Sequence, residues 1–434
     1  MKLKQQPDDF RVEELTDAVA GDAGEFALYR LDKTGWTTPD ALSAIRRRWQ
    51  IDARRLSYGG LKDRHAVTAQ HVTIFRGPKR HLSHERVTLT YLGQRAEPFT
   101  AQDIRANRFT VVLRAMSDAA VSHAETALRE VADAGLPNYF DDQRFGSVIS
   151  SPSPLAGEGG ESEDRVRGET LAHPSRDPSP VGEAPPPSPA RGEGQKEPEF
   201  VAKEMVFGRF ERALWLALAA PYEFDRADAK REKATLIELW ARWPECQAKL
   251  PKGHARSLVS YLAPHPTDFK GAVARLRPEL QGLYLSAYQS YLWNKMLATW
   301  LTNTLGAANL TDVELKLGRV PAPVRVPDAC RAAWESLTLP LPSARVKPEP
   351  GASWLAMVEE VLKTEGLTLA ELKVKGMQKP FFSKGDRPAS VRPEHLTYVA
   401  EMDELNKGRR KLTLRFDLPR GSYATMLVKR VSAQ

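Results

Sequence analysis

Alternating apolar and polar residues predict strands near both ends of the chain. Residues 66–75 alternate as a half-buried strand does, and in residues 107–114 Phe109, Val111 and Leu113 fall on one face. A further strand is expected at residues 411–417, followed by a turn at Pro419-Arg420-Gly421 and an apolar run at residues 426–428.

Helical patterns fill much of the chain between these strands. One helix is expected to begin at Thr38, a good N-cap residue followed by Pro39 at the first helical position, and to continue to about Trp49. Three more are expected at residues 205–219, 229–243 and 283–301. Strands at both ends with helices between them predict an α+β body that carries a mostly helical insertion.

Residues 151–199 differ in composition from the rest of the chain. Of these 49 residues, 23 are Pro, Gly or Ser, and none is aromatic. Such a segment buries too little apolar surface to offset the entropy that ordering costs, so we expect it to be disordered. It carries 5 basic and 10 acidic residues, so the overall charge of +8 divides into −5 here and +13 elsewhere.

The remaining composition excludes several classes of protein. The longest apolar run, residues 213–220, is too short to cross a bilayer, and the N-terminus has no apolar stretch like that of a signal peptide. The two cysteines, Cys246 and Cys330, lie far apart and form neither a disulfide framework nor a zinc-ligand spacing. We therefore expect a cytoplasmic protein whose basic charge suits an anionic partner.

The sharpest candidate for chemistry is the segment 58–70, in which a glycine pair leads to Lys62 and Asp63 just before a strand. Two glycines allow backbone conformations that other residues avoid, and they allow the close approach of a ligand. Taken alone, Gly60-x-Lys62-Asp63 is more often an ordinary polar turn. His65 has no His or Cys at ligand spacing, so it is interpreted as a histidine at the strand entrance.

The whole segment resembles the signature of TruD-type pseudouridine synthases, Gly-x-Lys-Asp-x-x-Ala-x-Thr-x-Gln. Every fixed position is present: Gly60, Lys62, Asp63, Ala66, Thr68 and Gln70. Six other stretches resemble the family in the same order along the chain: residues 4–14, 28–35, 107–109, 135–146, 286–290 and 418–425. Seven ordered matches cover nearly the whole chain except residues 151–199 and much of 301–380.

The resemblance implies a catalytic pseudouridine synthase domain with a mixed, largely antiparallel sheet. It implies that this domain comprises residues 1–146 and 393–434. A TRUD insertion domain at residues 147–392 would contain the low-complexity insert at 151–199. The low-complexity segment begins shortly after Gly146, where the family passes into the TRUD domain. The sequence therefore does not define the first residue of the TRUD domain.

The resemblance also implies the residues of the site. Asp63 matches the catalytic aspartate, and Lys4 matches a basic residue that pairs with it. Phe10, Asn107 and Phe109 match positions that contact the target base. From the residues alone, Phe109 is equally a core residue of its strand, and Asn107 is equally a turn residue at the start of the strand.

The resemblance implies isomerisation of uridine 13, in the D arm of tRNA, without a cofactor or a metal ion. The carboxylate either attacks the sugar as a nucleophile or removes a sugar proton, and the sequence leaves both routes open. A monomer is the working expectation. An RNA-binding protein or chaperone without catalysis is the competing class, and it would need no carboxylate at position 63.

Two other acidic pairs, Glu13-Glu14 and Asp141-Asp142, are interpreted as surface charges, because neighbouring residues of a strand point to opposite faces. Gln143 and Arg144 suit either contact with a phosphate or stabilisation of their loop. A metal- or nucleotide-dependent RNA enzyme has no support, since the chain has neither a phosphate-binding Gly-x-x-x-x-Gly-Lys loop nor clustered His and Cys.

Overall fold

The computed structural model describes residues 1–146, 148, 197–222, 225–377 and 379–433. The expected disordered segment therefore lies outside the described residues, apart from residues 197–199. The chain forms two compact units, Met1–Gly146 with Pro278–Gln434, and Ser147–Arg277. The first unit contains the sheet.

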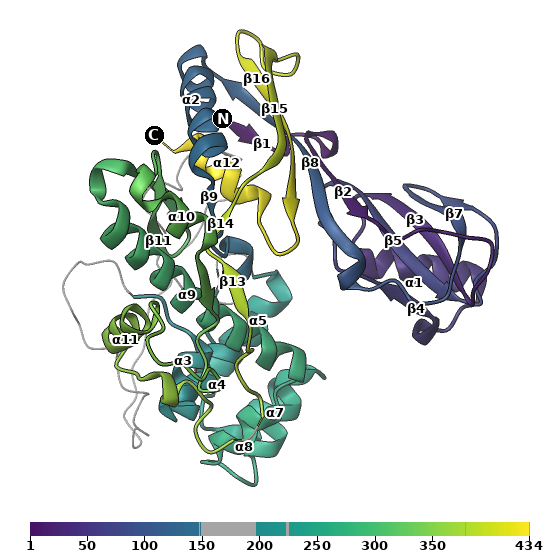
Figure 1. The fold of residues 1–434 in the computed structure, drawn as a ribbon. Helices are drawn as coiled ribbons and strands as arrows, with labels where there is room; N and C mark the ends of the chain where they lie inside the picture. The colour runs from purple at the N-terminus through teal and green to yellow at the C-terminus, as the bar shows by residue number, and fades with distance from the viewer. Residues whose placement is uncertain (147, 149–196, 223–224, 378, 434) are drawn as a thin grey trace, which may run out of the picture. The chain divides into compact units, whose positions relative to one another are not determined.

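Within the described residues, one sheet of ten strands dominates the first unit (Figure 1). Its strand order is β15-β16-β8-β2-β5-β3-β7-β6, with β1 paired to β8 and β4 paired to β5. The strands are β1 (Lys2–Leu3), β2 (Phe10–Thr16), β3 (Phe26–Thr34), β4 (Leu56–Tyr58), β5 (Val67–Phe75), β6 (Leu82–His84), β7 (Val87–Arg95), β8 (Ile104–Met116), β15 (Glu394–Met402) and β16 (Arg410–Pro419). The strands expected at residues 66–75, 107–114 and 411–417 are confirmed as β5, β8 and β16.

The pair β2 and β5 is parallel, whereas the other strand pairs of this sheet are antiparallel. The expected α+β fold with a mixed, largely antiparallel sheet is confirmed. Parallel neighbours begin at the same edge of a sheet, so the residues that precede β2 and those that precede β5 meet there.

Helix α1 (Thr38–Trp49) covers one face of the sheet through Ala41, Leu42 and Ile45, which pack with buried residues of β3, β5 and β7. Its N-cap is Thr37, whose side chain accepts a hydrogen bond from the backbone N–H of Asp40. The expected N-cap at Thr38 is thus wrong by one residue. Thr38 is the first helical residue, and its side chain is buried.

The described residues of the first unit also form further helices and three small strand pairs. The helices are α2 (Asp118–Ala134), α9 (Pro278–Leu305), α10 (Asp328–Ser336), α11 (Leu355–Thr364) and α12 (Ala424–Ser432), and α12 packs beside α2 (Figure 1). The strand pairs are β9 (Leu136–Pro137) with β14 (Ser390–Val391), β10 (Leu310–Leu315) with β11 (Gly318–Pro323), and β12 (Thr338–Pro340) with β13 (Asp386–Pro388). The helix expected at residues 283–301 is confirmed within α9, and the apolar run 426–428 lies in α12. Short 3-10 turns span Pro7–Asp9, Ala53–Arg55, Ala101–Asp103, Asp142–Phe145, Ala307–Asn309 and Leu369–Glu371.

The described part of the second unit is helical: α3 (Val201–Phe207), α4 (Phe210–Leu218), α5 (Ala227–Glu238), α6 (Trp243–Lys249), α7 (His254–Leu262) and α8 (Phe269–Ala274). The helical character expected at residues 205–219 and 229–243 is confirmed for most of these positions, but each stretch is interrupted by a break between two helices. Gly208, with φ of 75°, ends α3 in the left-handed conformation that glycine adopts easily. Residues 239–242 separate α5 from α6.

Candidate active site

The candidate site lies at the edge of the sheet where β2 and β5 begin. β1 pairs with β8 at Leu113 and Arg114, and β2 pairs with β8 from Val111 back to Ile104. The two strands therefore follow one another along the same edge of β8. The connecting residues 4–9 loop out between them, which brings Lys4 to the start of β2 and next to the segment that leads into β5.

A pocket of about 220 Å³ opens at this edge. It is lined by Phe10, Val12, Leu61, Lys62, Asp63, Asn107, Phe109, Gln143, Ser422, Tyr423, Ala424 and Thr425. Asp63 is the acidic residue among them. Four of the five residues expected in the site line this pocket, and the fifth, Lys4, contacts Asp63.

Asp63 is held at both of its carboxylate oxygens. Lys4 Nζ donates to Oδ2 and forms an ion pair with it, and the backbone N–H of His65 donates to Oδ1 over 2.9 Å. The Asp63 side chain is 31% exposed and the Lys4 side chain 24% exposed. The carboxylate is therefore fixed in position yet open to a ligand.

The environment of Asp63 favours its ionised form. Burial raises the pKa of this carboxyl, but the hydrogen bond from Lys4, the backbone hydrogen bond from His65 and the charge of Lys4 together lower the pKa below its ordinary value. Asp63 is thus a carboxylate at neutral pH, as a nucleophile or a base requires.

The backbone of the segment that carries Asp63 is braced by three neighbouring side chains. The Lys62 N–H donates to Thr38 Oγ1 over 3.0 Å, and Gln70 Nε2 donates to the Gly60 carbonyl over 3.1 Å. Lys33 Nζ donates to the carbonyl of Asp63 over 2.9 Å and also to that of Trp36 over 2.8 Å. Gln70 belongs to the signature segment, so one of its fixed positions has a clear structural reason.

Lys33 is unusual because its residue is only 1% exposed and the partners of its ammonium group are backbone carbonyls. Burial lowers its pKa to about 8, although the charge of Asp63 acts in the opposite direction. Sequence reasoning missed this residue, although it stands in the stretch 28–35 that resembles the family.

The glycine pair Gly59-Gly60 does not adopt the unusual backbone conformation that the sequence suggested. Neither Gly59 nor Gly60 has a positive φ, so no special backbone conformation is needed there. A Cβ at position 59 would lie 2.4 Å from Ile104 Cδ1 and 2.9 Å from the backbone oxygen of Thr100, so close packing leaves no room for a side chain there. A Cβ at position 60 would meet nothing within 4 Å.

Aromatic rings form one wall of the pocket. The ring of Phe10 meets that of Phe109 edge to face at 6.3 Å, and Phe109 stacks on Phe416 at 5.4 Å. Phe10 is 5% exposed and Phe109 is 8% exposed, so each ring packs mostly in the core and reaches the pocket with a small part of its surface. Lys4 Nζ lies 4.3 Å from the Phe10 ring centroid, which adds a cation–π contact.

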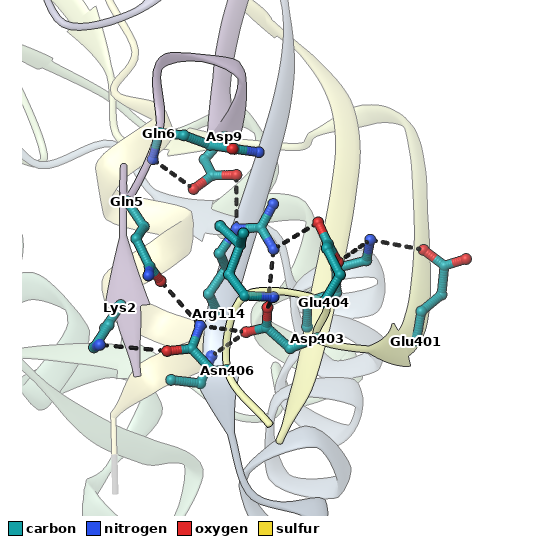
Figure 2. Close-up of polar contacts among 12 residues, drawn as sticks. Lys2, Gln5, Gln6, Asp9, Arg114, Glu401, Asp403, Glu404 and Asn406 are labelled. Atoms are coloured by element: carbon teal, nitrogen blue, oxygen red, sulfur yellow. Dashed lines mark hydrogen bonds and ion pairs between the residues drawn. The ribbon is translucent and has the colours of Figure 1, made fainter. Parts of the chain in front are cut away.

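A buried ionic network anchors the segment that carries Lys4 (Figure 2). Arg114 of β8, whose side chain is 3% exposed, donates from Nε to Asp9 over 2.8 Å and from Nη1 to Asp403 over 3.0 Å. Asp9 in turn accepts from the backbone N–H of Gln6 over 3.0 Å. Asn406, which donates to Asp403, also donates to Gln5 over 2.9 Å. Both ends of the short stretch after Lys4 are thus tied to the sheet.

The interpretation of two acidic pairs as surface charges is wrong for one member of each. Glu14 and Asp141 are both 2% exposed. Glu14 shares a strand face with Phe10 and Val12, and it pairs with Lys62. The carboxylate of Asp141 accepts hydrogen bonds from Thr425 over 2.5 Å and Lys429 over 2.6 Å. The period-2 pattern of β2 could have indicated the orientation of Glu14.

The C-terminal turn also contributes to the pocket, which sequence reasoning did not predict. Residues 422–425 line it. The only available signal was the resemblance of residues 418–425 to the family. Gln143 lines the pocket and is exposed, whereas Arg144 packs its guanidinium 5.2 Å from the Phe140 ring centroid.

A larger pocket of about 570 Å³ lies in the second unit, between α4 and residues 267–270, with Trp215 and Trp240 in its lining. Its acidic side chains are already engaged: Glu211 accepts from Trp240 Nε1, and Asp268 accepts from the N–H of Gly271. Among the described residues that line it, no carboxylate is paired with a lysine ammonium, so the smaller pocket is the better candidate for chemistry.

The described residues show neither a metal-binding cluster nor a membrane-spanning helix. No group of three or more His, Cys, Asp or Glu side chains in that part of the chain is arranged to hold a metal ion. Nor does the described structure contain a helix of sufficient length and apolar character to span a membrane.

Comparison with known proteins gives a consistent result. The profile of tRNA pseudouridine synthase D (TruD) matches residues 1–151 and 192–431. A probable tRNA pseudouridine synthase D 1 of Methanococcus maripaludis is 27% identical over 99% of both chains. The tRNA pseudouridine synthase D of Aquifex aeolicus is 26% identical, over 99% of this chain and 98% of its own.

A solved structure supports the same fold. The crystal structure of the putative tRNA pseudouridine synthase D from Methanosarcina mazei superposes with a TM-score of 0.67, at 23% identity, over 99% of this chain and 93% of that chain. The profile match extends over far more than half of the chain and includes the whole candidate site. The chain therefore belongs to the tRNA pseudouridine synthase D (TruD) family.

Proposed function

We propose that this protein isomerises uridine 13, in the D arm of tRNA, to pseudouridine, with Asp63 as the catalytic carboxylate and Lys4 as its ionic partner. Family membership makes the chain a tRNA pseudouridine synthase, an isomerase. The position within tRNA is carried over from the resemblance of the sequence to the family. The role of Asp63 is supported by one observation above all: an ionised carboxylate, paired with a lysine, is the acidic residue that lines the pocket.

The reaction breaks the bond from uracil N1 to ribose C1′, turns the base and joins C5 to C1′. C5 loses its proton once this bond has formed and N1 takes one up, so the product is an isomer of uridine. In one route the Asp63 carboxylate attacks C1′ as uracil leaves, and C5 later displaces the carboxylate from C1′. In the other, Asp63 takes a proton from the sugar to give a glycal and returns it after the base has turned. Both routes need a carboxylate that is ionised and fixed beside the sugar, and neither requires a redox or group-carrying cofactor.

The walls of the pocket suit a uracil that has been turned out of the RNA stack. Phe10 and Phe109 offer apolar ring surface, and stacking on an aromatic ring contributes about 1–3 kcal/mol per base. Asn107 offers an amide to the polar edge of the base. Lys4 keeps the Asp63 carboxylate ionised.

Replacing Asp63 by Asn tests this proposal. The amide keeps the size of the side chain and can still accept from the His65 N–H, but it can neither attack the sugar effectively nor take its proton. We expect no detectable pseudouridine, while tRNA affinity stays within about tenfold of the wild type, or about 1.4 kcal/mol. Product is measured by mapping pseudouridine at each position of a purified tRNA substrate, and binding is measured by titration.

A tRNA with cytidine at position 13 is the matched substrate control, and it should yield no pseudouridine with the wild-type protein. Full product formation by the Asp63→Asn variant, checked for deamidation, would place the chemistry on another residue. A wild-type protein that binds tRNA and forms no pseudouridine would instead support the non-catalytic alternative. Product at a position other than 13 would correct the assigned target alone.

A further inference from the structure

A largely buried ion pair lies beside Asn107. Glu14 of β2 and Asn107 of β8 are partners across the two strands. Lys62 Nζ lies 3.1 Å from Glu14 Oε2 and donates to Asn107 Oδ1 over 2.7 Å. The side chain of Glu14 is 0% exposed and that of Lys62 is 9% exposed. Both charges are therefore largely removed from water, and Lys62 and Asn107 both belong to the residues that line the pocket.

Glu14 is held in place from two directions. Its Oε1 accepts from the backbone N–H of His71 over 2.9 Å and lies 3.4 Å from the ring Nδ1 of the same residue. Its Oε2 faces the Lys62 ammonium as an ionic contact rather than a directed hydrogen bond. Burial raises the pKa of Glu14, but the hydrogen bond with His71 and the charge of Lys62 bring it below its ordinary value. The carboxylate is ionised and so balances the charge of Lys62.

This arrangement decides which way the Asn107 amide faces. An ammonium group has three donors and no acceptor, so the amide atom next to Lys62 must be the oxygen. The amide nitrogen is then the atom left for the pocket, since Nδ2 makes no hydrogen bond with any described residue. Asn107 consequently presents donors to the pocket, although a free amide could donate or accept equally well.

We infer that Glu14 and Lys62 are positioning residues that hold the Asn107 amide as a hydrogen-bond donor, and that Asn107 donates to a carbonyl oxygen of the target uracil. The inference rests on the proposed function. It specifies that Asn107 acts as the hydrogen-bond donor and the base as the acceptor. Uracil has carbonyl oxygens at positions 2 and 4, and both are acceptors. Cytosine carries an amino group at position 4, so a donor aimed at that position would also select against cytidine.

Thio-substituted substrates test the inference. A tRNA is prepared with uridine, 2-thiouridine or 4-thiouridine at the target position, because sulfur accepts hydrogen bonds more weakly than oxygen does. We expect wild-type kcat/KM to fall about tenfold for one of the two thio substrates, which identifies the oxygen that is contacted. Asn107→Ala should lose activity on uridine by a similar factor and should show no further loss on that thio substrate.

The double variant E14Q/K62M tests the positioning role. It removes both buried charges together, because Lys62→Met alone would leave the buried Glu14 carboxylate without its ammonium partner and could unfold the protein. Without the Lys62 donor the Asn107 amide is free to turn over. We expect E14Q/K62M to lower kcat/KM on uridine about tenfold and to lose the discrimination against the thio substrate, as Asn107→Ala does.

The exposed pair Glu25 and Arg76 provides a matched control, since its side chains are 57% and 70% exposed. The variant E25Q/R76M removes the same two charges far from the pocket and should keep the wild-type rate and the wild-type thio ratio. Thermal melting of each variant reports whether the fold is retained. The thio ratio compares two substrates on one folded protein, so a change in stability alone does not alter it.

Two results would overturn the inference while leaving the proposed function intact. One is a wild-type protein that converts all three substrates at equal rates. The other is a folded E14Q/K62M variant that keeps the wild-type thio ratio. A wild-type protein that forms no pseudouridine from any of the three tRNAs would overturn the proposed function itself, and the inference with it.

Discussion

Lys4 contacts two of the groups that the proposed chemistry uses. Its ammonium pairs with the Asp63 carboxylate and lies over the Phe10 ring. Its backbone has a φ of 55°, in the left-handed region that residues other than glycine rarely adopt. Such a conformation persists where the surroundings impose it, here the anchoring of the chain on both sides of Lys4. The position of the ammonium is thus determined by the fold rather than by the side chain alone.

Removing the ammonium should change the pH dependence of the reaction. In Lys4→Met the burial that raises the Asp63 pKa remains, whereas two of the effects that lower it are lost. The pKa of Asp63 should therefore rise, and the acid limb of the profile of kcat/KM against pH should move to higher pH. Single-turnover rates measured from pH 4 to pH 8 give this limb directly.

Lys4→Arg is the matched control, because it keeps a positive charge that can pair with Asp63. Its acid limb should stay close to that of the wild type, even if its maximal rate is lower. A Lys4→Met limb at the wild-type pH, or shifted to lower pH, would show that Lys4 does not control the ionisation of Asp63. The folding of the tRNA is checked over the same pH range.

At this scale the sequence could predict several of the residues that touch the pocket, but neither the C-terminal turn that completes its lining nor the residues behind it. Asp63, Phe10, Asn107 and Phe109 stand in short motifs, and they line one pocket. Their roles in the reaction stay predictions until variants are measured. Lys33 lies thirty positions from Asp63 along the chain, and its contact with the Asp63 carbonyl depends on how β3 packs against the segment before β5. No local pattern carries that information.

At the scale of elements, the site depends on strands that meet from distant parts of the chain. Arg114 of β8 forms ion pairs with two segments. One is with Asp9, in the turn before β2, and the other is with Asp403, between β15 and β16. Burial raises the pKa of Asp403, but backbone hydrogen bonds from Ala115 and Leu405 and contacts with Asn406 and Arg114 bring it far below its ordinary value. One guanidinium therefore ties the N-terminal strands to the C-terminal hairpin.

Replacing Arg114 by Met should strongly destabilise the first unit. The substitution leaves Asp9 and Asp403 buried without a cationic partner, and breaking a buried ion pair in this way costs about 3–5 kcal/mol. We expect a large drop in Tm, measured by calorimetry or circular dichroism. The loss should be smaller at low pH, where protonation relieves the unpaired carboxylates.

An exposed ion pair serves as the comparison. Arg54 and Asp52 form a surface pair in which the Arg54 side chain is 89% exposed. Arg54→Met should leave Tm unchanged within error, because exposed pairs contribute little to stability. Equal Tm values for the two variants would show that the Arg114 network does not stabilise the fold.

Clear alternation of apolar and polar residues predicted strands correctly. The ends of helices, in contrast, depend on contacts that the local pattern does not show. The alternation in residues 66–75 and 107–114 gave β5 and β8, because half-buried strands need that period. The division between α3 and α4 at Gly208 was missed, since apolar residues continue on both sides of the break. Thr38 was assigned as an N-cap by its side-chain type, whereas its hydroxyl is used to brace Lys62 instead.

At the scale of the whole molecule, the division into two compact units differs in extent from the expected domains. Residues 278–392 pack with the first unit, although the resemblance to the family placed them in the TRUD insertion domain. The two units are defined by which residues pack together, whereas the expected TRUD domain is defined by where it is inserted in the sequence. The expected domain boundaries therefore stay a prediction. The sequence could not predict the packing of α9, whose contacts lie far away along the chain; Asn294, for example, bonds with the backbone of Phe140.

The low-complexity segment leads to the last prediction. The family profile passes over residues 152–191, and these residues include no aromatic side chain and few large apolar ones. They offer little that could stabilise a core. Lengthening or shortening a flexible connection changes stability slowly, by about 0.6 kcal/mol for each doubling of its length. A chain in which a short Gly-Ser linker replaces residues 152–191 should therefore keep its Tm within a few degrees, and its rate of pseudouridine formation within about twofold.

The deletion keeps Glu199, which pairs with Arg212 of α4 over 2.6 Å. A second variant, Glu199→Gln in the full-length chain, separates the loss of that contact from the loss of the segment. Removal of 40 residues that carry 4 basic and 7 acidic side chains makes the protein more positive by 3 charges. Affinity for tRNA should consequently rise slightly at low salt and match the wild type at high salt, where counterions screen the difference. A cooperative loss of stability, or loss of activity in a deletion variant that still binds tRNA, would show that the segment packs against the enzyme or takes part in its function.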